Sequence, residues 1–210
     1  MRTFVYVDGF NLYYGALKSS KHKWLDLKAL FTNILRADNK ILKIKYYTAR
    51  VSARPDDLDA PTLQDIYLRA LEQHIPELTI TEGHFISRPV QMKLATPIAG
   101  NQYASVMKTE EKGSDVNLAV HMVNDGWKGL YDCAVVCSND GDLSEALRIV
   151  RRELHKTVIL AIPGDPNNRP PSVELKRWAS YTKRITPDDL AKSQLPNPIP
   201  GTTFHKPATW

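Results

Sequence analysis

Two kinds of segment alternate along this chain: short runs of apolar residues, and longer segments in which apolar residues recur at helical spacing. The runs at 133–137 and 158–162 are apolar throughout, which is typical of strands buried on both faces of a parallel sheet. A shorter β-rich run occupies 4–7, and the segment 114–125 carries one apolar helical stripe. This alternation predicts an α/β fold, a three-layer α/β/α sandwich with a mostly parallel central sheet.

The same patterns place the remaining elements. Further strands are predicted at 41–51, 78–86 and 181–185. Further helices are predicted at 26–35, from Pro61 onward, and at 173–178. After 78–86 we expect an extended or hairpin continuation through Val90 and Met92. Loops are predicted at 96–102 and 163–171. The segment 108–113 is predicted as a charged connection that leads into the helix at 114–125, and Gly126 is predicted to mark the end of that helix.

The chain is interpreted as a single domain over 1–190 followed by a Pro-rich extended tail over 191–210. A length of 210 residues is sufficient for one well-buried domain. Four prolines from Pro196 onward disfavour regular structure in the tail. A protein partner for this tail, and a homo-oligomer, are both left open by the sequence.

Composition narrows the class of protein. Hydrophobic residues make up 42% and charged residues 24%, as in an ordinary globular domain. No stretch approaches the roughly 18–20 apolar residues that span a bilayer, and the N-terminus lacks a signal-peptide core, so we expect no membrane association. Cys133 and Cys137 share one predicted strand and are poor disulfide partners, which favours a reducing, cytoplasmic location.

Acidic residues follow two of the predicted strands. Asp8 ends the first strand, Asp140 and Asp142 follow the run at 133–137, and Asp115 begins the helix before that run. The carboxyl ends of parallel strands share one edge of a sheet, so these carboxylates can meet there. Such a set, without cysteine or histidine, suits Mg²⁺ or Mn²⁺ rather than Zn²⁺ and is typical of phosphoryl-transfer sites.

Structural roles for the same residues stay open. Asp8 could serve a turn before Gly9, Asn11 could cap a helix, and Asp115 could interact with a helix dipole. Two like charges about 4 Å apart repel by roughly 4 kcal/mol at an effective dielectric constant near 20, so a pair such as Asp140 and Asp142 favours a cation between them. The net charge of +5 and pI of about 9.1 suit a polyanionic substrate around an acidic centre.

Three blocks carry a resemblance to a known family: Val-Asp-Gly-Phe-Asn-Leu at 7–12, Glu-Lys-Gly-Ser-Asp-Val at 111–116 and Ser-Asn-Asp-Gly-Asp-Leu at 138–143. Over roughly 1–165 the chain resembles the NYN domain, a branch of the PIN-like nucleases with a Rossmann-like sandwich. The resemblance implies a metal-dependent ribonuclease in which Mg²⁺ or Mn²⁺ activates a water that attacks phosphorus in line and leaves a 5′-phosphate. The implied metal ligands are Asp8, Asp115, Asp140 and Asp142.

The resemblance also assigns supporting residues. Asn11 matches the family's amide position and Ser138 its small hydroxyl position. Lys112, Arg50 and Arg54, with Lys18 and Lys21, are offered only as a phosphate-binding rim for RNA, and Tyr13 and Tyr14 as base-stacking residues. The additional glutamate of many PIN nucleases is not assigned here to any of its possible matches: Glu72, Glu110 or Glu111.

Two other functions are compatible with the same residues. An RNA-binding or regulatory NYN module could keep the acidic pocket and cut weakly or not at all. A metal-dependent phosphohydrolase could act on a small phosphate ester. The presence of all four acids favours the metal-dependent endoribonuclease over the binding module. A groove lined by Arg and Lys would favour a polymer as substrate, and a closed pocket would favour a small molecule.

Overall fold

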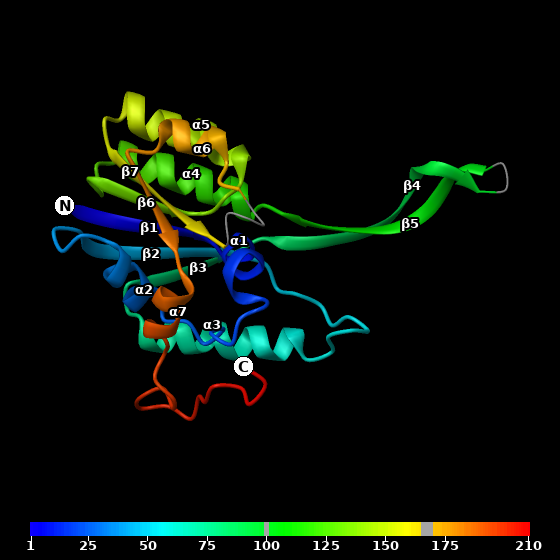
Figure 1. Cartoon of the computed structure of the whole chain (residues 1–210), viewed down its shortest axis with the longest axis horizontal. Helices are drawn as coiled ribbons and strands as arrows, with labels where there is room; N and C mark the ends of the chain where they lie inside the picture. Colours follow the sequence, from blue (N-terminus) through cyan, green and yellow to red (C-terminus); the bar gives the residue numbers. More distant parts are fainter. Residues whose placement is uncertain (99–100, 165–169) are drawn as a thin grey trace.

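A computed structural model of the chain describes residues 1–98, 101–164 and 170–210, and its centre is a six-stranded sheet (Figure 1). All pairings within this sheet are parallel, which confirms the predicted α/β sandwich. The strand order is β3-β2-β1-β6-β7-β8. The strands are β1 (Arg2–Asp8), β2 (Lys40–Thr48), β3 (Leu78–Glu82), β6 (Cys133–Cys137), β7 (Thr157–Pro163) and β8 (Tyr181–Ile185).

Helices cover both faces of the sheet, as Figure 1 shows. One face carries α1 (Gly9–Leu12), its π-helical continuation η1 (Tyr13–Leu17), α2 (Leu27–Ile34), α3 (Ala60–His74) and α7 (Pro187–Lys192). The other carries α4 (Ser114–Trp127), the 3₁₀ turn η2 (Gly141–Leu143), α5 (Ser144–Arg148), its π-helical continuation η3 (Ile149–Glu153) and α6 (Val173–Trp178). Within the described ranges, none of these helices is long and apolar enough to cross a membrane.

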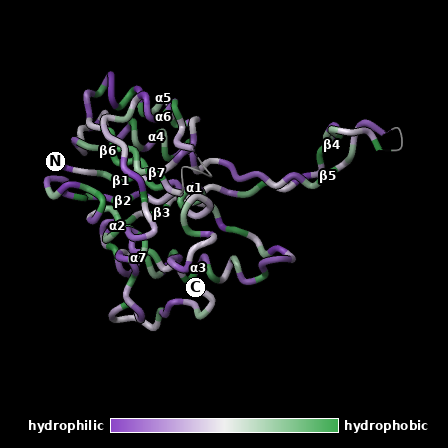
Figure 2. The backbone as a smooth tube through the Cα atoms, viewed as in Figure 1, coloured by the Kyte–Doolittle hydropathy of each residue, from purple (hydrophilic) through white to green (hydrophobic). Residues whose placement is uncertain are grey.

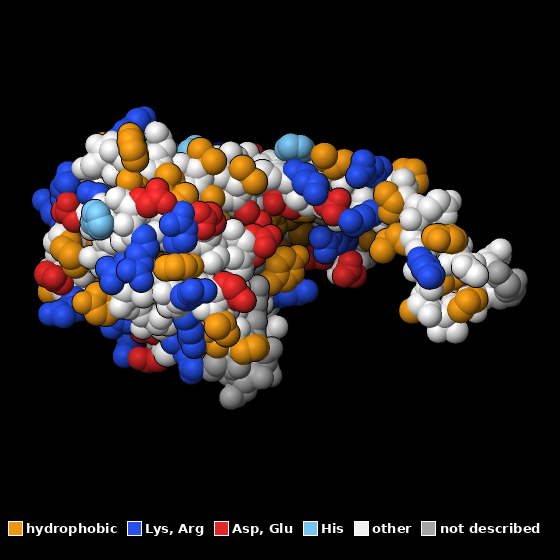
Figure 3. Space-filling view, turned by 90° about the horizontal axis from the view of Figure 1, so that it is seen from above, with side chains coloured by type: hydrophobic (Ala, Val, Ile, Leu, Met, Phe, Trp, Pro, Cys, Tyr) orange, Lys and Arg blue, Asp and Glu red, His pale blue; other side chains and the backbone are white. Residues whose placement is uncertain are grey.

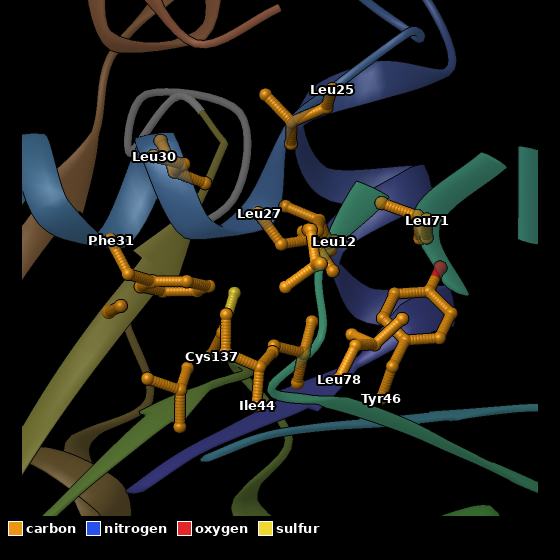
Figure 4. Close-up of a cluster of buried hydrophobic side chains, with 14 of the residues drawn as sticks. Leu12, Leu25, Leu27, Leu30, Phe31, Ile44, Tyr46, Leu71, Leu78 and Cys137 are labelled. Carbon is orange, nitrogen blue, oxygen red and sulfur yellow. The ribbon is translucent and has the colours of Figure 1, made fainter. Parts of the chain in front are cut away.

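The core is divided between the two faces by the alternation of side chains along β1. Val5 and Val7 face the α2 side, while Phe4 and Tyr6 face the α4 side. Figure 4 shows how leucines of α1 and α2 pack onto the sheet around Phe31. Because each fully buried apolar side chain stabilises the fold by roughly 1.5–3 kcal/mol, this double core holds the strand ends in fixed positions.

Helix α4 continues past Gly126, so the prediction that this glycine ends the helix was wrong. A Cβ atom on Gly126 would lie 2.6 Å from the hydroxyl oxygen of Tyr131 and 2.9 Å from Leu154. The Tyr131 hydroxyl donates to the Met122 carbonyl at 2.8 Å. Gly126 is therefore required for packing against Tyr131, and the helix ends at Trp127.

A long hairpin of β4 (His84–Ile98) and β5 (Asn101–Lys112) projects from the domain (Figure 1). The predicted hairpin continuation through Met92 is confirmed, whereas the predicted strand at 78–86 is interrupted at Gly83. The prediction of a loop at 96–102 was wrong for 96–98 and 101–102, which belong to the two strands of the hairpin. The charged segment at 108–112, predicted as a connection, is also strand. Residues 99–100, and 165–169 of the other predicted loop, lie outside the described residues.

The hairpin, which we call the arm, exposes side chains on both of its faces. Met92, Tyr103 and Met107 are exposed, and hydrophilic and hydrophobic residues are mixed along its length (Figure 2). Without one buried face, the arm has no strict alternation of apolar and polar residues, which is the usual signal of a strand. This explains why its second strand was not predicted.

Helix α7 was also missed, although its start carries a clear signal. The Thr186 hydroxyl accepts from the Asp189 backbone N–H, while the Asp189 carboxylate accepts from the Thr186 backbone N–H at 2.8 Å. Pro187 occupies the first helical position. This capping box with an N-terminal proline is sufficient to predict a short helix.

The last residues, 196–210, contain no helix or strand but lie against the α2 and α3 side of the domain. The Trp210 ring centroid lies 6.3 Å from that of Trp24 and 5.8 Å from that of Tyr67. The Trp24 indole N–H donates to the Pro196 carbonyl at 3.1 Å. These contacts join the tail to the core.

We expect Trp210→Ala to destabilise the protein, because it removes the aromatic contacts that join the tail to Trp24 and Tyr67. A loss of about 2 kcal/mol corresponds to a fall in Tm of roughly 4–8 °C, measurable by differential scanning calorimetry. Trp127→Ala is the matched control, since Trp127 is 77% exposed. An unchanged Tm for Trp210→Ala would show that the tail does not stabilise the proposed domain over 1–190.

Candidate functional site

The candidate site lies where the order of strands in the sheet reverses. Strand β1 pairs with β2 along one edge and with β6 along its other edge, so the sheet grows in opposite directions from β1. Asp8 is the last residue of β1, and Ser138 follows directly after β6. In open α/β sheets, ligands bind in the crevice at the carboxyl ends of the strands at such a reversal.

Asp8 is a buried carboxylate, only 3% exposed, held by three hydrogen bonds. The Asn11 backbone N–H donates to its Oδ1 at 2.9 Å. The Asn11 side-chain amide and the Ser138 hydroxyl donate to its Oδ2 at 2.6 and 2.9 Å. Burial raises the pKa of Asp8, and these hydrogen bonds oppose that rise. Asp8 is thus both the N-cap of α1 and a carboxylate in a fixed orientation.

The turn after β6 is fixed to β1 and α1 by a chain of hydrogen bonds. The Asn139 backbone N–H donates to Asn11 Oδ1 at 3.2 Å, and that of Asp140 donates to Ser138 Oγ at 3.0 Å. The Asp142 N–H in turn donates to Asp140 Oδ1 at 3.0 Å. Asp140 therefore caps the following turn, η2, with its side chain.

Asp115 enters the site from the first turn of α4. Burial and the surrounding charges raise its pKa to about 6; after burial the contributing carboxylates are, in decreasing order, Asp8, Asp140, Glu111 and Asp142. The four predicted acids are therefore close enough to repel one another. This mutual repulsion is the electrostatic condition that a bound cation relieves.

Glu111 belongs to the same cluster, although the sequence left it unassigned. Its carboxylate accepts from the Ser114 backbone N–H at 3.1 Å and from the Ser114 hydroxyl at 2.7 Å. The four-residue separation from Asp115 made a shared site difficult to infer. Gly113, with φ of 100°, turns the chain from β5 into α4, so Glu111 and Asp115 line the same cavity.

A cavity of about 330 Å³ opens over these residues. Figure 3 shows acidic side chains gathered at the hollow between the body of the molecule and the base of the arm. Asp140 and Asp142 are outside the cavity lining, but they lie close enough for their charges to act on Asp115. The described residues that line it are Asp8, Phe10, Asn11, Tyr14, Arg54, Phe85, Glu111, Ser114 and Asp115.

The basic residues proposed as a phosphate-binding rim differ in whether they line the cavity or pair with acidic side chains. Arg54 lines the cavity. Arg50 is paired with Glu82 and Asp65, each at 2.7 Å, and Lys112 lies 3.5 Å from Glu110. Of these three cations, Arg54 is the one that the structure brings to the cavity.

The donor set consists of carboxylate, amide and hydroxyl oxygens, the ligands that Mg²⁺ and Mn²⁺ prefer. Within the ranges that the structure describes, no three His, Cys, Asp or Glu side chains are grouped so that one ion could be held by all of them. Mg²⁺ commonly binds through one or two carboxylates and keeps several waters. The residues fit such a partly hydrated ion, with Asp8 and Asp115 as the side chains that line the cavity.

We expect Asp115→Asn to stabilise the protein at pH 7.5 in EDTA. The pKa of Asp115 is raised from 3.8 to about 6 in the folded state, so ionisation costs stability as pH rises through that range. Because Asp115 is partly solvated, the gain is about 1 kcal/mol, or roughly 2–4 °C in Tm, and it shrinks as pH falls toward 4. A lower Tm at pH 7.5 would mean that the charge mainly stabilises the start of α4.

The chain is similar to known proteins in sequence and in fold. The chain is 32% identical to 6-hydroxy-3-succinoylpyridine 3-monooxygenase HspA of Pseudomonas putida over 237 residues, which cover 100% of this chain and 75% of that protein. A crystal structure of VPA0982, a protein of unknown function from Vibrio parahaemolyticus, superposes with a TM-score of 0.54 at 16% identity. The superposition covers 89% of this chain and 94% of the VPA0982 chain. At that sequence identity the similarity shows the fold alone.

The family model of the NYN domain matches residues 2–182, which include β1, the arm, α4 and the turn after β6. The resemblance stated from three short blocks is therefore confirmed over most of the chain. This protein belongs to the NYN domain family, a branch of the PIN-like nucleases.

Proposed function

We propose that this protein is a metal-dependent endoribonuclease that hydrolyses RNA phosphodiester bonds with Mg²⁺ or Mn²⁺. The observation that carries the proposal is the convergence of Asp8, Asp115 and Glu111 on one cavity at the strand-order reversal. Asp140 and Asp142 complete the acidic cluster, since their charges act on Asp115. Membership of the NYN family supports the reaction class, since PIN-like nucleases usually use divalent metals.

The roles of the residues follow from their positions. Asp8 and Asp115 would hold the metal directly, and Asp140 and Asp142 would act on it through its bound waters. A divalent ion supplies neutralisation of phosphate charge and activation of one of these waters. Asn11 and Ser138 keep the Asp8 carboxylate in one orientation through their hydrogen bonds, a supporting role that commonly affects metal affinity. Arg54, on the cavity wall, would contact the RNA phosphate.

Cleavage of labelled single-stranded RNA in Mn²⁺ tests this proposal. Asp8→Asn and Asp140→Asn should each reduce the rate by more than about 100-fold, whereas Ser138→Ala should reduce it by roughly 10–100-fold. Asp188→Asn is the matched control, because Asp188 lies on α7 and pairs with Lys192 at 2.6 Å. Calorimetry should detect Mn²⁺ binding to the wild type and none to the Asp8→Asn, Asp140→Asn double variant.

The outcomes separate the alternatives. Cleavage that survives both aspartate substitutions would refute the site assignment. RNA binding without cleavage at any metal concentration would favour the regulatory module. Hydrolysis of a small ester such as p-nitrophenyl phosphate, in the absence of RNA cleavage, would favour the small-molecule phosphohydrolase.

A second candidate function has its own support. The Pseudomonas putida relative is a monooxygenase of a substituted pyridine, and the similarity extends over 100% of this chain. We infer as this second candidate that the protein oxygenates a pyridine-type ring. In that reaction one atom of O₂ enters the ring, and the other becomes water with two electrons from a reduced nicotinamide or flavin.

Oxygen uptake tests this second candidate. The protein is incubated with 6-hydroxy-3-succinoylpyridine and reduced nicotinamide, with and without flavin, and O₂ consumption is followed together with product mass. Consumption that requires both the protein and the pyridine, with an oxygenated product, would support an oxygenase. The same reaction without the pyridine controls for simple oxidation of the donor. Absence of uptake with either donor would contradict this function.

A further inference from the structure

A second cavity, of about 380 Å³, adjoins the acidic one. Phe10, Tyr14 and Arg54 line both cavities, so the two share a wall. Its volume lies within the range of roughly 300–1,000 Å³ that is usual for small-ligand sites. Its walls are rich in aromatic side chains, contributed by α1, η1, β2, α3 and the tail: Phe10, Tyr13, Tyr14, Tyr46, Tyr67 and Trp210.

Tyr46, in the cavity wall, differs from the other buried tyrosines. The hydroxyls of the other four are each hydrogen-bonded: Tyr6 to Asp125, Tyr47 to His121, Tyr67 to the Leu25 carbonyl and Tyr131 to the Met122 carbonyl. Tyr46 is only 6% exposed, and its hydroxyl makes no hydrogen bond to the described part of the chain. The oxygen is not one of the fully enclosed unpartnered atoms, which are Glu77 Oε2 and Gln194 Oε1, so it is open to the cavity that Tyr46 lines. A hydroxyl that opens into a cavity in this way is available to hydrogen-bond a ligand bound there.

The position and protonation of the Tyr46 hydroxyl are both fixed. A Cβ atom on Gly9 would lie 2.7 Å from this oxygen, so Gly9 permits the tyrosine ring to reach the cavity beside α1. Burial and the nearby Asp8 charge raise the pKa of Tyr46 well above its usual value. The hydroxyl is therefore a hydrogen-bond donor at neutral pH, and it lies close to the acidic cluster.

The charged side chains of the cavity wall are balanced in sign, so its aromatic walls, and not its charge, indicate the kind of ligand. The charged lining residues are Lys18, Lys23 and Arg54 with Asp56, Asp57 and Asp59. The Lys18 ammonium lies 5.1 Å from the centroid of the Tyr14 ring, which is 49% exposed. The Phe10 ring is stacked on Tyr14 with centroids 6.5 Å apart, so the exposed part of the Tyr14 ring extends this aromatic wall between the two cavities.

We infer that this aromatic cavity binds a planar heteroaromatic ring, stacked on Tyr14 and hydrogen-bonded by Tyr46, and that its occupant is a nucleobase next to the cleaved phosphate. Aromatic walls suit any base, because every base presents a π face, and the Tyr46 donor suits a ring carbonyl or ring nitrogen. The choice of a nucleobase rests on the proposed ribonuclease function. The inference that the cavity binds a heteroaromatic ring does not depend on that function.

Calorimetric titration of the wild type in EDTA, where metal-dependent cleavage cannot occur, separates the parts of the ligand. Uridine 5′-monophosphate carries base, sugar and phosphate; ribose 5-phosphate lacks the base; and 2-hydroxypyridine is a free ring. The nucleotide should bind at least about 10-fold more tightly than ribose 5-phosphate, because base stacking contributes most of the difference.

Two variants locate the ring. Tyr46→Phe removes only the unpartnered hydroxyl and should weaken nucleotide binding about 3- to 10-fold, with an unchanged Tm that shows intact folding. Tyr14→Ala removes the stacking face and should weaken binding about 5- to 100-fold. Tyr181→Ala is the matched control, since Tyr181 is 61% exposed on β8 and lies outside the cavity lining.

Each outcome bears on one part of the inference. Equal affinity for the nucleotide and ribose 5-phosphate, unaffected by Tyr46→Phe, would overturn the ring site. Binding of 2-hydroxypyridine but not of the nucleotide would support the ring site and overturn the nucleobase as its occupant. Tyr46-dependent nucleotide binding without RNA cleavage in Mn²⁺ would support the inference while the proposed ribonuclease function fails.

Discussion

The burial of the Asp8 carboxylate is the interaction on which the rest of this site depends. A carboxylate removed from water is strongly unfavourable unless hydrogen bonds or a cation compensate it. Asn11 and Ser138 supply that compensation, and in doing so they join α1 and the turn after β6 to the end of β1. The double core on either side of the sheet supplies the stability that allows such a cluster of like charges to persist.

The capping and functional interpretations of the acidic residues turn out to be compatible. Asp8 and Asp140 each cap the helical turn that follows them, as a purely structural interpretation predicts. A cap, however, uses only part of the hydrogen-bonding capacity of a carboxylate, which has about four acceptor positions. Capping therefore fixes the orientation of the side chain and leaves acceptor positions for a ligand.

The strands of the sheet, and the acids at its edge, could be predicted because buried parallel strands are continuous apolar runs and their carboxyl ends share one edge. Other features depend on contacts that have no local pattern. Glu111 reaches the site through the left-handed backbone of Gly113, and the second strand of the arm has no buried face to impose alternation. Tyr46 has the pattern of a core strand residue, and its unpartnered hydroxyl is visible only once the fold is known.

The arm is structurally continuous with the site. Its two ends are bordered by Gly83 and Gly113, and the ladder pair nearest the cavity joins Phe85 to Glu111, both of which line it. Phe85 also contacts Phe10 edge to face, with ring centroids 5.8 Å apart. The wall of the cavity and the projecting hairpin are thus one continuous ladder. The base of the hairpin is therefore part of the site, so a substitution in either strand there changes the cavity wall as well as the arm.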